Sequence, residues 1–249
     1  MPLALKYGII SDVHANFTAM QVALEHLEAV GCDKILNLGD LVGYGAEPAQ
    51  CVEAIRVRGD TLSIVGNHDR QAVGETDDRM RKTAAKVLEW TAQRLSTEDV
   101  AFLKHLPQGM VVEDKIVMVH GALTERDTYM LNADEINRNM QSLIDDFPAA
   151  RVCFFGHTHV PMLIGTKGVM TNLKETKVFK LDPNDRYMIN PGSVGQPRDK
   201  CPLSSFGIFD TKNWTMTFVR KPYDYRKTQA KIIENGLPEK FARRLAVGI

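Results

Sequence analysis

Residues 7–16 read YGIISDVHAN, a short apolar run that breaks into a polar segment carrying Asp12 and His14. The run Tyr7–Ser11 has the length and apolar character of a buried strand. Four later segments repeat this arrangement, namely LNLGD (36–40), IVGNHD (64–69), VMVH (117–120) and FFGHTH (154–159). Because five separate segments each end an apolar run in polar residues, this pattern decides the fold class and points to a shared site.

The first part of the chain alternates strand-like and helix-like segments, which predicts an α/β fold. Apolar runs predict strands at Tyr7–Ser11, Lys34–Leu38, Leu62–Val65, Ile116–Val119 and Val152–Phe155. Helical spacing and capping residues predict helices at Phe17–Val30, Pro48–Arg58, Asp77–Arg94 and Thr97–His105. Ser96, with acidic residues after it, is a typical start for the last of these helices.

After Gly156 the segments become shorter and resemble antiparallel strands joined by turns. These predicted strands are Met162–Ile164, Lys177–Leu181, Tyr187–Ile189, Ser205–Phe209 and Thr215–Val219. The tail from Tyr225 predicts two helices separated at Gly236–Pro238. Since no repeat, low-complexity run or linker interrupts the chain, we expect one domain over residues 1–249.

The polar residues that follow the predicted strands are of types that bind metals. They are Asp12, His14, Asp40, Asn67, His68, His120, His157 and His159. In open α/β sheets, sites form beyond the carboxyl ends of the strands, so these side chains can converge. Glycines at positions 39, 66, 121 and 156 adjoin them, where a strand turns sharply into a loop.

Each of these residues has a purely structural alternative. Asp12, Asp40 and Asn67 can be turn or cap residues, and a single histidine can be a hydrogen-bonded core residue. Five coincidences would be needed for that alternative to hold at every segment, so we favour a metal site. His26 and His105, on or near helices, are expected to be surface or capping residues.

The ordered set of motifs resembles the calcineurin-like metallophosphoesterase superfamily, in particular its compact bacterial and archaeal phosphoesterases. The family pattern runs D-x-H, G-D, G-N-H-D/E, an isolated H and G-H-x-H. Here these elements are Asp12-Val13-His14, Gly39-Asp40, Gly66-Asn67-His68-Asp69, His120 and Gly156-His157-Thr158-His159. The match spans about Gly8 to Val160, and NPGSVGQPRD (190–199) and GLPEKFARRL (236–245) extend it.

The resemblance implies a fold and a role for each residue. The fold would be a four-layer α/β/β/α sandwich of two mixed sheets flanked by helices. The first metal ion would be bound by Asp12, His14 and His159, and the second by Asn67, His120 and His157. Asp40 would bridge the two ions as a ligand and belong to the catalytic centre. His68 would not be a ligand but would act beside the substrate as general acid or phosphate-binding group.

The ligand chemistry agrees with the implied activity. Imidazole nitrogens with few carboxylates suit two divalent transition-metal ions, manganese first, with Fe, Zn, Ni or Co as alternatives. Two such ions about 3.5–4 Å apart stabilise the attacking and leaving oxygens of an in-line displacement and activate a bridging hydroxide. The two carboxylates leave the centre positively charged, so it should attract phosphate oxyanions.

The second motif departs from that of the large Ser/Thr protein phosphatases, which continue G-D-x-V-D-R-G. Here Gly43 replaces the acidic residue that orients the catalytic histidine, and Tyr44 replaces a phosphate-binding arginine. Tyr44 can line the entrance of the substrate site, and Arg198 can bind a second phosphate, although both can equally be packing or surface residues. Arg70 is expected to be a solvated side chain.

The composition limits which binding partners and which cellular compartment we expect. Lys plus Arg and Asp plus Glu both total 31 in 249 residues, so the chain has no basic excess typical of nucleic-acid binding. The N-terminal apolar stretch is too short for a membrane span and lacks a cleavage pattern. The four scattered cysteines favour reduced thiols. We therefore expect a cytoplasmic protein, with no prediction of its oligomeric state.

The function predicted from these residues is hydrolysis of phosphomonoesters or phosphodiesters, with a nucleotide or other small phosphoester as substrate. The first alternative is a protein phosphatase or a nuclease of the same superfamily. The second is a catalytically silent protein-binding scaffold, which would be expected to have lost ligands or His68. All of the motif residues are present, so the enzyme is the preferred hypothesis.

Overall fold

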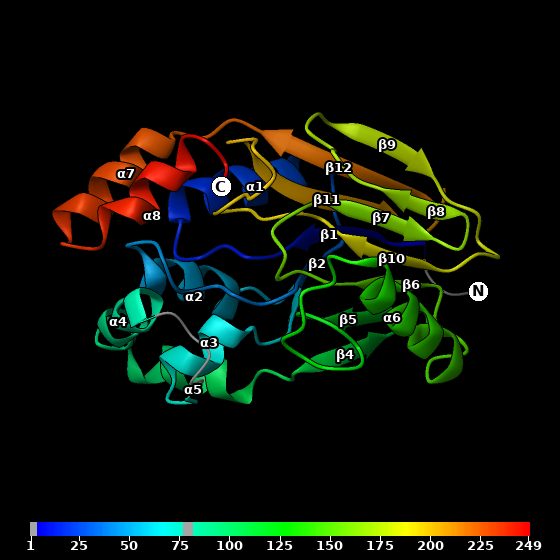
Figure 1. Ribbon diagram of the computed structural model, residues 1–249, viewed down its shortest axis with the longest axis horizontal. Helices are drawn as coiled ribbons and strands as arrows, with labels where there is room; N and C mark the ends of the chain where they lie inside the picture. Colours follow the sequence, from blue (N-terminus) through cyan, green and yellow to red (C-terminus); the bar gives the residue numbers. More distant parts are fainter. Residues whose placement is uncertain (1–3, 77–81) are drawn as a thin grey trace.

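Two six-stranded sheets lie face to face in the computed structural model, which describes residues 4–76 and 82–249 (Figure 1). The first sheet has the strand order β3 (Thr61–Ser63), β2 (Lys34–Asn37), β1 (Lys6–Ile10), β11 (Ser204–Asp210), β12 (Thr215–Lys221), β9 (Lys177–Lys180). Strands β1, β2 and β3 are parallel, whereas β11, β12 and β9 continue the sheet in antiparallel pairs. The sheet is therefore mixed.

The second sheet is mixed as well. Its order is β4 (Gly109–Val112), β5 (Ile116–Val119), β6 (Val152–Phe154), β10 (Tyr187–Asn190), β7 (Met162–Gly165), β8 (Gly168–Met170). Strands β5, β6 and β10 are parallel, and the outer pairs are antiparallel. Parallel β1, β2, β5 and β6 all end in the loops that carry the motif residues, so both sheets contribute to the same region.

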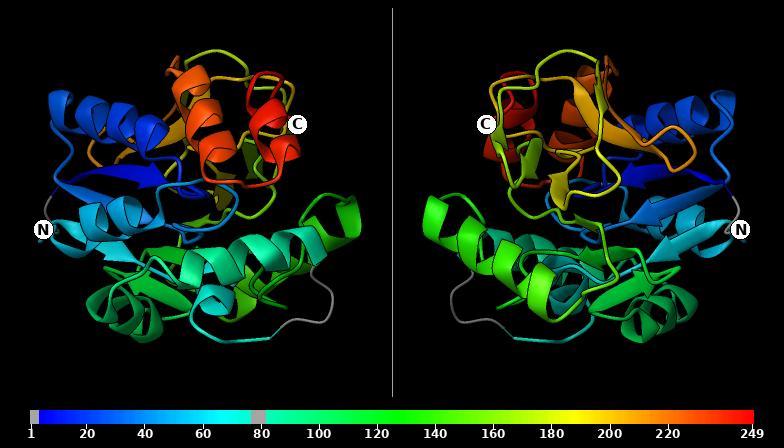
Figure 2. Two further views of the ribbon diagram at one scale, coloured as in Figure 1. Left: turned by 90° about the vertical axis from the view of Figure 1, so that its left-hand side faces the viewer. Right: turned by 90° about the vertical axis from the view of Figure 1, so that its right-hand side faces the viewer.

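Helices cover the outer faces of the sheets. The helices are α1 (Phe17–Ala29), α2 (Pro48–Arg56), α3 (Asn67–Ala72), α4 (Lys82–Ala92), α5 (Thr97–His105), α6 (Ala133–Asp145), α7 (Tyr225–Glu234) and α8 (Glu239–Leu245). Helices α1 and α2 pack on the first sheet, and α6 packs on the second. Helices α7 and α8 lie side by side at one end of the molecule (Figure 2).

Alternating side chains along the strands explain the layers. In β6, Phe154 lies in the apolar cluster between the two sheets, while Cys153 lies in the cluster under α6. In β1, Ile9 faces the other sheet and Ile10 faces α1. Because successive side chains point to opposite faces of a strand, each sheet is apolar on both faces. Three apolar layers therefore separate four layers of structure, which confirms the α/β/β/α sandwich.

Most predicted elements are present, and the differences have local causes. Asn16 caps α1 by accepting from the Ala19 N–H, and Ser96 with Asp99 forms a capping box at α5. The helix predicted from Asp77 begins at Lys82 among the described residues, because residues 77–81 lie outside them. Strands β4 and β8 and helices α3 and α6 were not predicted.

The expectation that the later strands are all antiparallel is wrong for β10. Its Tyr187 and Met188 lie in parallel register with Val152 and Cys153 of β6, while its other edge is antiparallel to β7. The pairing follows from the long excursion through β7, β8 and β9, which allows the chain to return in the direction of β6.

Two further expectations concern the chain as a whole. All four cysteines are free thiols, three of them buried and Cys32 half-buried. Within residues 4–76 and 82–249, no helix is both long enough and apolar enough to cross a membrane.

Candidate metal centre

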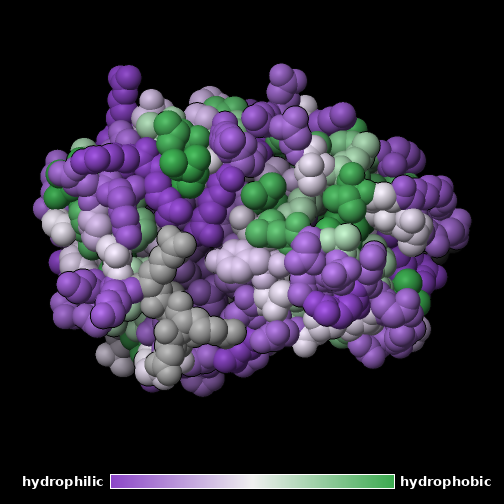
Figure 3. Space-filling view, viewed as in Figure 1, coloured by the Kyte–Doolittle hydropathy of each residue, from purple (hydrophilic) through white to green (hydrophobic). Residues whose placement is uncertain are grey.

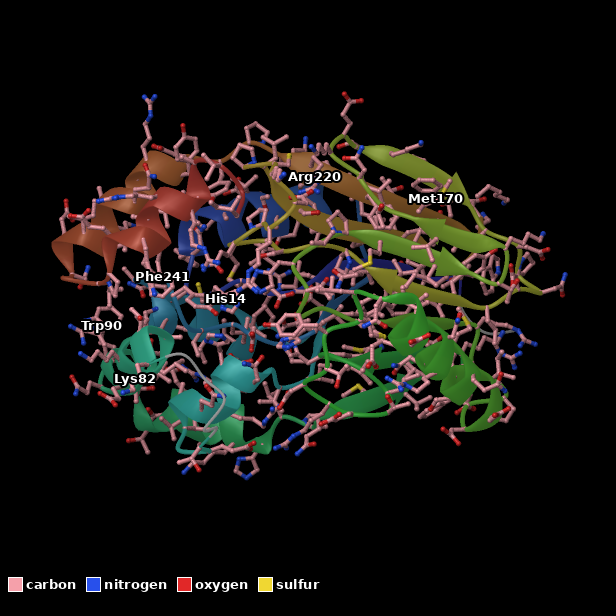
Figure 4. The ribbon with its side chains drawn as sticks, viewed as in Figure 1. His14, Lys82, Trp90, Met170, Arg220 and Phe241 are labelled. Atoms are coloured by element: carbon pink, nitrogen blue, oxygen red, sulfur yellow. The ribbon has the colours of Figure 1, made fainter. Side chains whose placement is uncertain are left out.

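The predicted ligand residues come together from loops of both sheets. Asp12 and His14 follow β1, Asp40 follows β2, Asn67 and His68 begin α3, His120 follows β5, and His157 and His159 follow β6. All of these side chains are buried. In Figure 4, His14 lies between the upper part of the molecule, which holds α7 and α8, and the lower part, which holds α3 and α5 (Figure 1).

Three groups of these residues have the spacing that a metal ion requires. Each group offers ligand atoms that all lie within 4.8 Å of one another. The groups are Asp12-His14-His159, Asp40-His120-His157 and His14-Asp40-His68. Asp12 and His159 are far apart in the chain, so the fold, and not local sequence, creates the first group.

Asp40 lies between the first two groups. Its Oδ2 is 3.6 Å from His14 Nε2 and 3.4 Å from His120 Nε2. Its Oδ1 accepts a hydrogen bond of 2.8 Å from the His68 backbone N–H. One carboxylate therefore reaches a histidine of each group while its other oxygen is fixed by the start of α3.

Four of the histidines are oriented in the same way, by a backbone carbonyl that accepts from one ring nitrogen. The pairs are His14 Nδ1 to Val42 at 3.0 Å, His120 Nδ1 to Leu38 at 2.8 Å, His159 Nδ1 to Gln196 at 2.6 Å, and His157 Nε2 to Asp127 at 3.1 Å. A carbonyl oxygen can only accept, so these nitrogens carry the hydrogen. In the neutral form of each ring, the second nitrogen is then left with a lone pair, as in metal-binding histidines.

The lone pairs face one another at short range. His14 Nε2 and His159 Nε2 are 3.0 Å apart, and Asp12 Oδ1 lies 3.2 Å from the same His159 atom. That buried Asp12 oxygen accepts no hydrogen bond from the described residues. In the other group, Asn67 Oδ1 is 3.2 Å from His120 Nε2. Acceptor atoms that converge in this way repel unless a cation lies among them, so the donor set fits metal ions.

The electrostatics of the two groups differ. Burial lowers the pKa of His14 and His159, and lowers that of His157 to about 3, which keeps these rings in the neutral form that binds metals. Burial also disfavours charge on His120, but the Asp40 carboxylate outweighs it and raises the pKa to about 10. The Asp40 carboxylate thus favours a positive charge at His120 Nε2, which either a proton or a bound metal ion can supply.

The ligand loops have an unusual backbone. Asp12, His14, Asp40, His157 and His159 all have φ between 51° and 64°, in the left-handed region. Non-glycine residues rarely adopt this conformation, and such strain collects at functional sites. Gly156 allows the loops to approach, because a Cβ there would lie 2.0 Å from Ser11 Oγ.

Asp69 joins the loops and was given no role from the sequence. Its buried carboxylate accepts from the backbone N–H groups of Asp40 (2.7 Å), Val42 (3.1 Å) and Gly66 (3.0 Å). Burial and then the Asp40 charge raise its pKa to about 7. Its place at the end of the G-N-H-D motif was the signal that could have identified it as the link between the second and third motifs.

His68 differs from the four fixed histidines. Its Nδ1 is buried and has no hydrogen-bond partner among the described residues. The ring is held by packing, 4.5 Å from the ring of Tyr44 and 4.8 Å from that of His14. A Cβ at Gly43 would lie 2.4 Å from His68 Nδ1, so position 43 has no room for an orienting side chain. Burial lowers the His68 pKa to about 4.

The expectation that Arg70 is solvated is wrong. Its guanidinium binds both carboxylate oxygens of Asp127, at 2.7 and 2.8 Å, and its Nε donates to Glu75 at 3.2 Å. Asp127 is the residue whose carbonyl accepts from His157. Arg70 therefore fixes the loop that orients a candidate ligand. This role depends on a partner from a distant segment, so the sequence around Arg70 does not indicate it.

The remaining candidates lie beside the ligand groups. The Tyr44 ring is 4.6 Å from that of His14, and Arg198 donates from its backbone N–H to the His159 carbonyl at 3.3 Å. The loop that carries Arg198 is held close to the last motif, because Asn190 Nδ2 donates to the Gly156 carbonyl at 2.7 Å. The NPGSVG segment (190–195) therefore lies beside the GHTH loop (156–159).

Comparisons with known proteins agree with this geometry. The family model described as a calcineurin-like phosphoesterase superfamily domain matches residues 5–214. An uncharacterized protein of Methanocaldococcus jannaschii is 37% identical over 248 residues, which cover 97% of each chain. The crystal structure of a metallophosphoesterase from Sphaerobacter thermophilus is 38% identical, covers 99% of this chain and 100% of its own, and has a TM-score of 0.85. A hypothetical protein of Pyrococcus horikoshii, 19% identical with 98% of each chain covered, shares the fold at a TM-score of 0.79.

Proposed function

Because the chain belongs to the calcineurin-like phosphoesterase superfamily, we propose that it hydrolyses a nucleotide or another small phosphoester with two divalent metal ions. The observation that carries the proposal is the convergence of lone pairs described above. Four buried histidines are oriented by backbone carbonyls into two groups that also contain Asp12 and Asp40, and Asp40 Oδ2 lies within 3.6 Å of a histidine of each group. A purely structural cluster would instead be expected to satisfy these polar atoms internally.

We assign the ligands by group. Asp12, His14 and His159 hold the first ion, Asn67, His120 and His157 hold the second, and Asp40 binds both. The donor set of imidazole nitrogens with few oxygens favours manganese or another of the transition metals Fe, Zn, Ni and Co. Support for the shared role of Asp40 comes from its Oδ2, which lies 3.6 and 3.4 Å from one histidine of each group.

The chemistry divides between the ions and the chain. Two divalent ions bound here would lower the pKa of a water molecule and offset the charge of the phosphoryl oxygens. His68 begins α3 beside both groups and is not turned away by a carbonyl, so its ring is free to face the substrate. As the neutral ring that its lowered pKa favours, it would donate a hydrogen bond to the phosphoryl group. A negatively charged phosphoester bound beside it would raise that pKa and allow the ring to deliver a proton to the leaving oxygen.

We also propose that residues 1–249 act as one domain, because the C-terminal helices contact the ligand loops. Thr228 Oγ1 of α7 donates to Asn16 Oδ1 at 2.9 Å, and Lys231 pairs with Glu47. On α8, the Phe241 ring lies 4.9 Å from the ring of Tyr44.

The experiment that tests the proposal uses metal-stripped protein with Mn, Ni, Zn or Mg added back. Hydrolysis of p-nitrophenyl phosphate and bis-p-nitrophenyl phosphate is measured for the wild type and for Asp134→Asn, a variant of an exposed aspartate on α6. We expect turnover to disappear on stripping and to return with a transition metal in both proteins. Two bound ions without turnover of either ester would contradict the proposal.

A further inference from the structure

Two tyrosines lie against the candidate ligands, one at each group. The Tyr44 ring is 4.6 Å from the ring of His14, which belongs to the first group. The Tyr129 ring stacks on His157 of the second group, with centroids 3.9 Å apart and planes at 29°. Tyr129 is 44% exposed, so its outer side faces solvent. The tyrosines therefore flank the mouth of the site.

Arg198 lies near both tyrosines. Its Nη2 donates to the Tyr44 hydroxyl at 3.4 Å and to Gln196 Oε1 at 3.0 Å, and Tyr129 lies near the same guanidinium. The backbone N–H of Arg198 donates to the carbonyl of His159, so the residue is anchored to the first group. Arg198 therefore lies beside Tyr44, which contacts the first group, and near Tyr129, which contacts the second.

Among the described residues, the side-chain hydrogen-bond partners of Arg198 are the neutral side chains of Tyr44 and Gln196. Among the ion pairs formed within the described part of the chain, none includes Arg198, and the neighbouring Asp199 binds Arg220 instead. The Nε of Arg198 is buried without a hydrogen-bond partner in the same residues. The side chain as a whole is half-buried, so a guanidinium whose Nε is buried without a partner keeps donors for an anion that arrives with the substrate.

The position of the guanidinium identifies which phosphate it meets. The ring of Tyr44, whose hydroxyl Arg198 Nη2 contacts, lies 4.5 Å from the ring of His68 and 4.6 Å from that of His14, and the backbone N–H of Arg198 donates to the His159 carbonyl. The guanidinium is thus close to a candidate ligand of the first ion and to the candidate general acid. This position belongs to the phosphoryl group that reacts, and not to a second phosphate farther along the substrate.

We propose that Arg198, held between Tyr44 and Tyr129, binds the non-bridging oxygens of the reacting phosphoryl group and so makes the site selective for phosphomonoesters over phosphodiesters. The proposal rests on the proposed function of the site. A guanidinium presents two parallel N–H donors that match two phosphate oxygens. A monoester offers about two negative charges at neutral pH, since its second pKa is about 6, whereas a diester offers one.

The test compares Arg198→Ala and Arg198→Lys with Arg138→Ala, which removes an arginine that is 62% exposed on α6. For each metal-loaded protein, kcat/KM is measured for p-nitrophenyl phosphate and for bis-p-nitrophenyl phosphate, and inorganic phosphate binding is measured by calorimetry. We expect Arg198→Ala to lower monoester kcat/KM about 10–100-fold, as for lost charge-assisted hydrogen bonds, and to lower diester kcat/KM less. The affinity for inorganic phosphate should fall together with kcat/KM for the monoester, and the number of metal ions bound per chain should not change.

The lysine variant and the phosphate titration make the outcomes separable. Arg198→Lys keeps the charge but not the two parallel N–H donors, so its kcat/KM for the monoester should lie between the values of the wild type and Arg198→Ala. An equal loss for both esters, an unchanged phosphate affinity or a loss of bound metal in Arg198→Ala would each overturn the proposal. Absence of turnover in the wild type would refute the function of the site, and the phosphate titration would still decide whether Arg198 binds the anion.

Discussion

The floor and the wall of the candidate site are held in different ways. The floor consists of His14, His120, His157 and His159, each fixed by a hydrogen bond from one ring nitrogen to a backbone carbonyl. The wall consists of His68, Tyr44, Tyr129 and Arg198, which are held by ring contacts and by hydrogen bonds between side chains. Backbone fixation gives geometry that suits a metal, whereas side-chain packing leaves donors for a substrate.

The largest expected effect follows from removing the one carboxylate that joins the two halves of the floor. Asp40→Asn keeps the shape of the side chain but removes its charge, so the two proposed metal ions would lose the ligand that we propose they share. We expect at least one ion to be lost and kcat/KM to fall about 10³-fold, since such ions contribute several kcal/mol. Metal content by atomic emission and hydrolysis of p-nitrophenyl phosphate measure this, with Asp134→Asn as the control. Full metal content in Asp40→Asn would refute the shared role.

The next effect separates the wall from the floor. His68→Ala should keep both ions, because His68 is not fixed as the ligand histidines are, while kcat falls about 10²–10⁴-fold. Metal content and steady-state kinetics are compared with those of His105→Ala, an exposed histidine near the end of α5. Loss of an ion in His68→Ala would show that His68 belongs with the metal-binding histidines of the floor, which would contradict its place in the wall.

A smaller effect is expected where the floor is supported from outside. Arg70→Ala removes the two hydrogen bonds that hold Asp127, and the carbonyl of Asp127 orients His157. We expect the affinity for the second ion to fall about 10–100-fold, with the first ion unaffected. Calorimetric titration of metal into metal-stripped protein separates the binding of the first ion from the binding of the second. Arg70→Lys provides a variant that keeps the charge. Equal weakening of both events would show that Arg70 acts on the whole fold.

The smallest effect is expected far from either region. Val178 on edge strand β9 is 61% exposed, and Met170 on β8 is 47% exposed. Figure 3 shows apolar side chains at the surface over β7 and β8, and Figure 4 places Met170 on that side of the molecule. Val178→Ser should change the free energy of unfolding by less than about 0.5 kcal/mol and leave metal content unchanged. A loss of metal would show that the edge is coupled to the site.

The sequence predicted the floor because each of its residues follows an apolar strand in a short motif. The turn of a strand into a loop is local, and the carboxyl ends of parallel strands meet at one edge, so His120 and His157, which follow the parallel neighbours β5 and β6, could be expected together. The packing of two sheets face to face was expected only from the family resemblance, because periodicity shows that a strand is buried but not against which layer.

The sequence did not predict the supports of the site. Arg70 was expected in solvent because its partner, Asp127, lies in a loop 57 residues away that has no recognisable motif. Tyr129 was missed for the same reason. Helix α6 was missed although Asn132 caps it and Asp134 and Glu135 occupy its first turn, which were usable local signals. Contacts between distant loops depend on the completed fold, and no pattern within either segment encodes them.

The most direct test of the central claim is a crystal structure of the manganese-soaked protein with anomalous diffraction data. The account predicts two anomalous peaks per chain. One should lie within coordination distance of Asp12, His14 and His159, the other within that of Asn67, His120 and His157, and Asp40 should contact both. A single peak, or two peaks with Asp40 bound to only one, would contradict a binuclear centre built on that carboxylate.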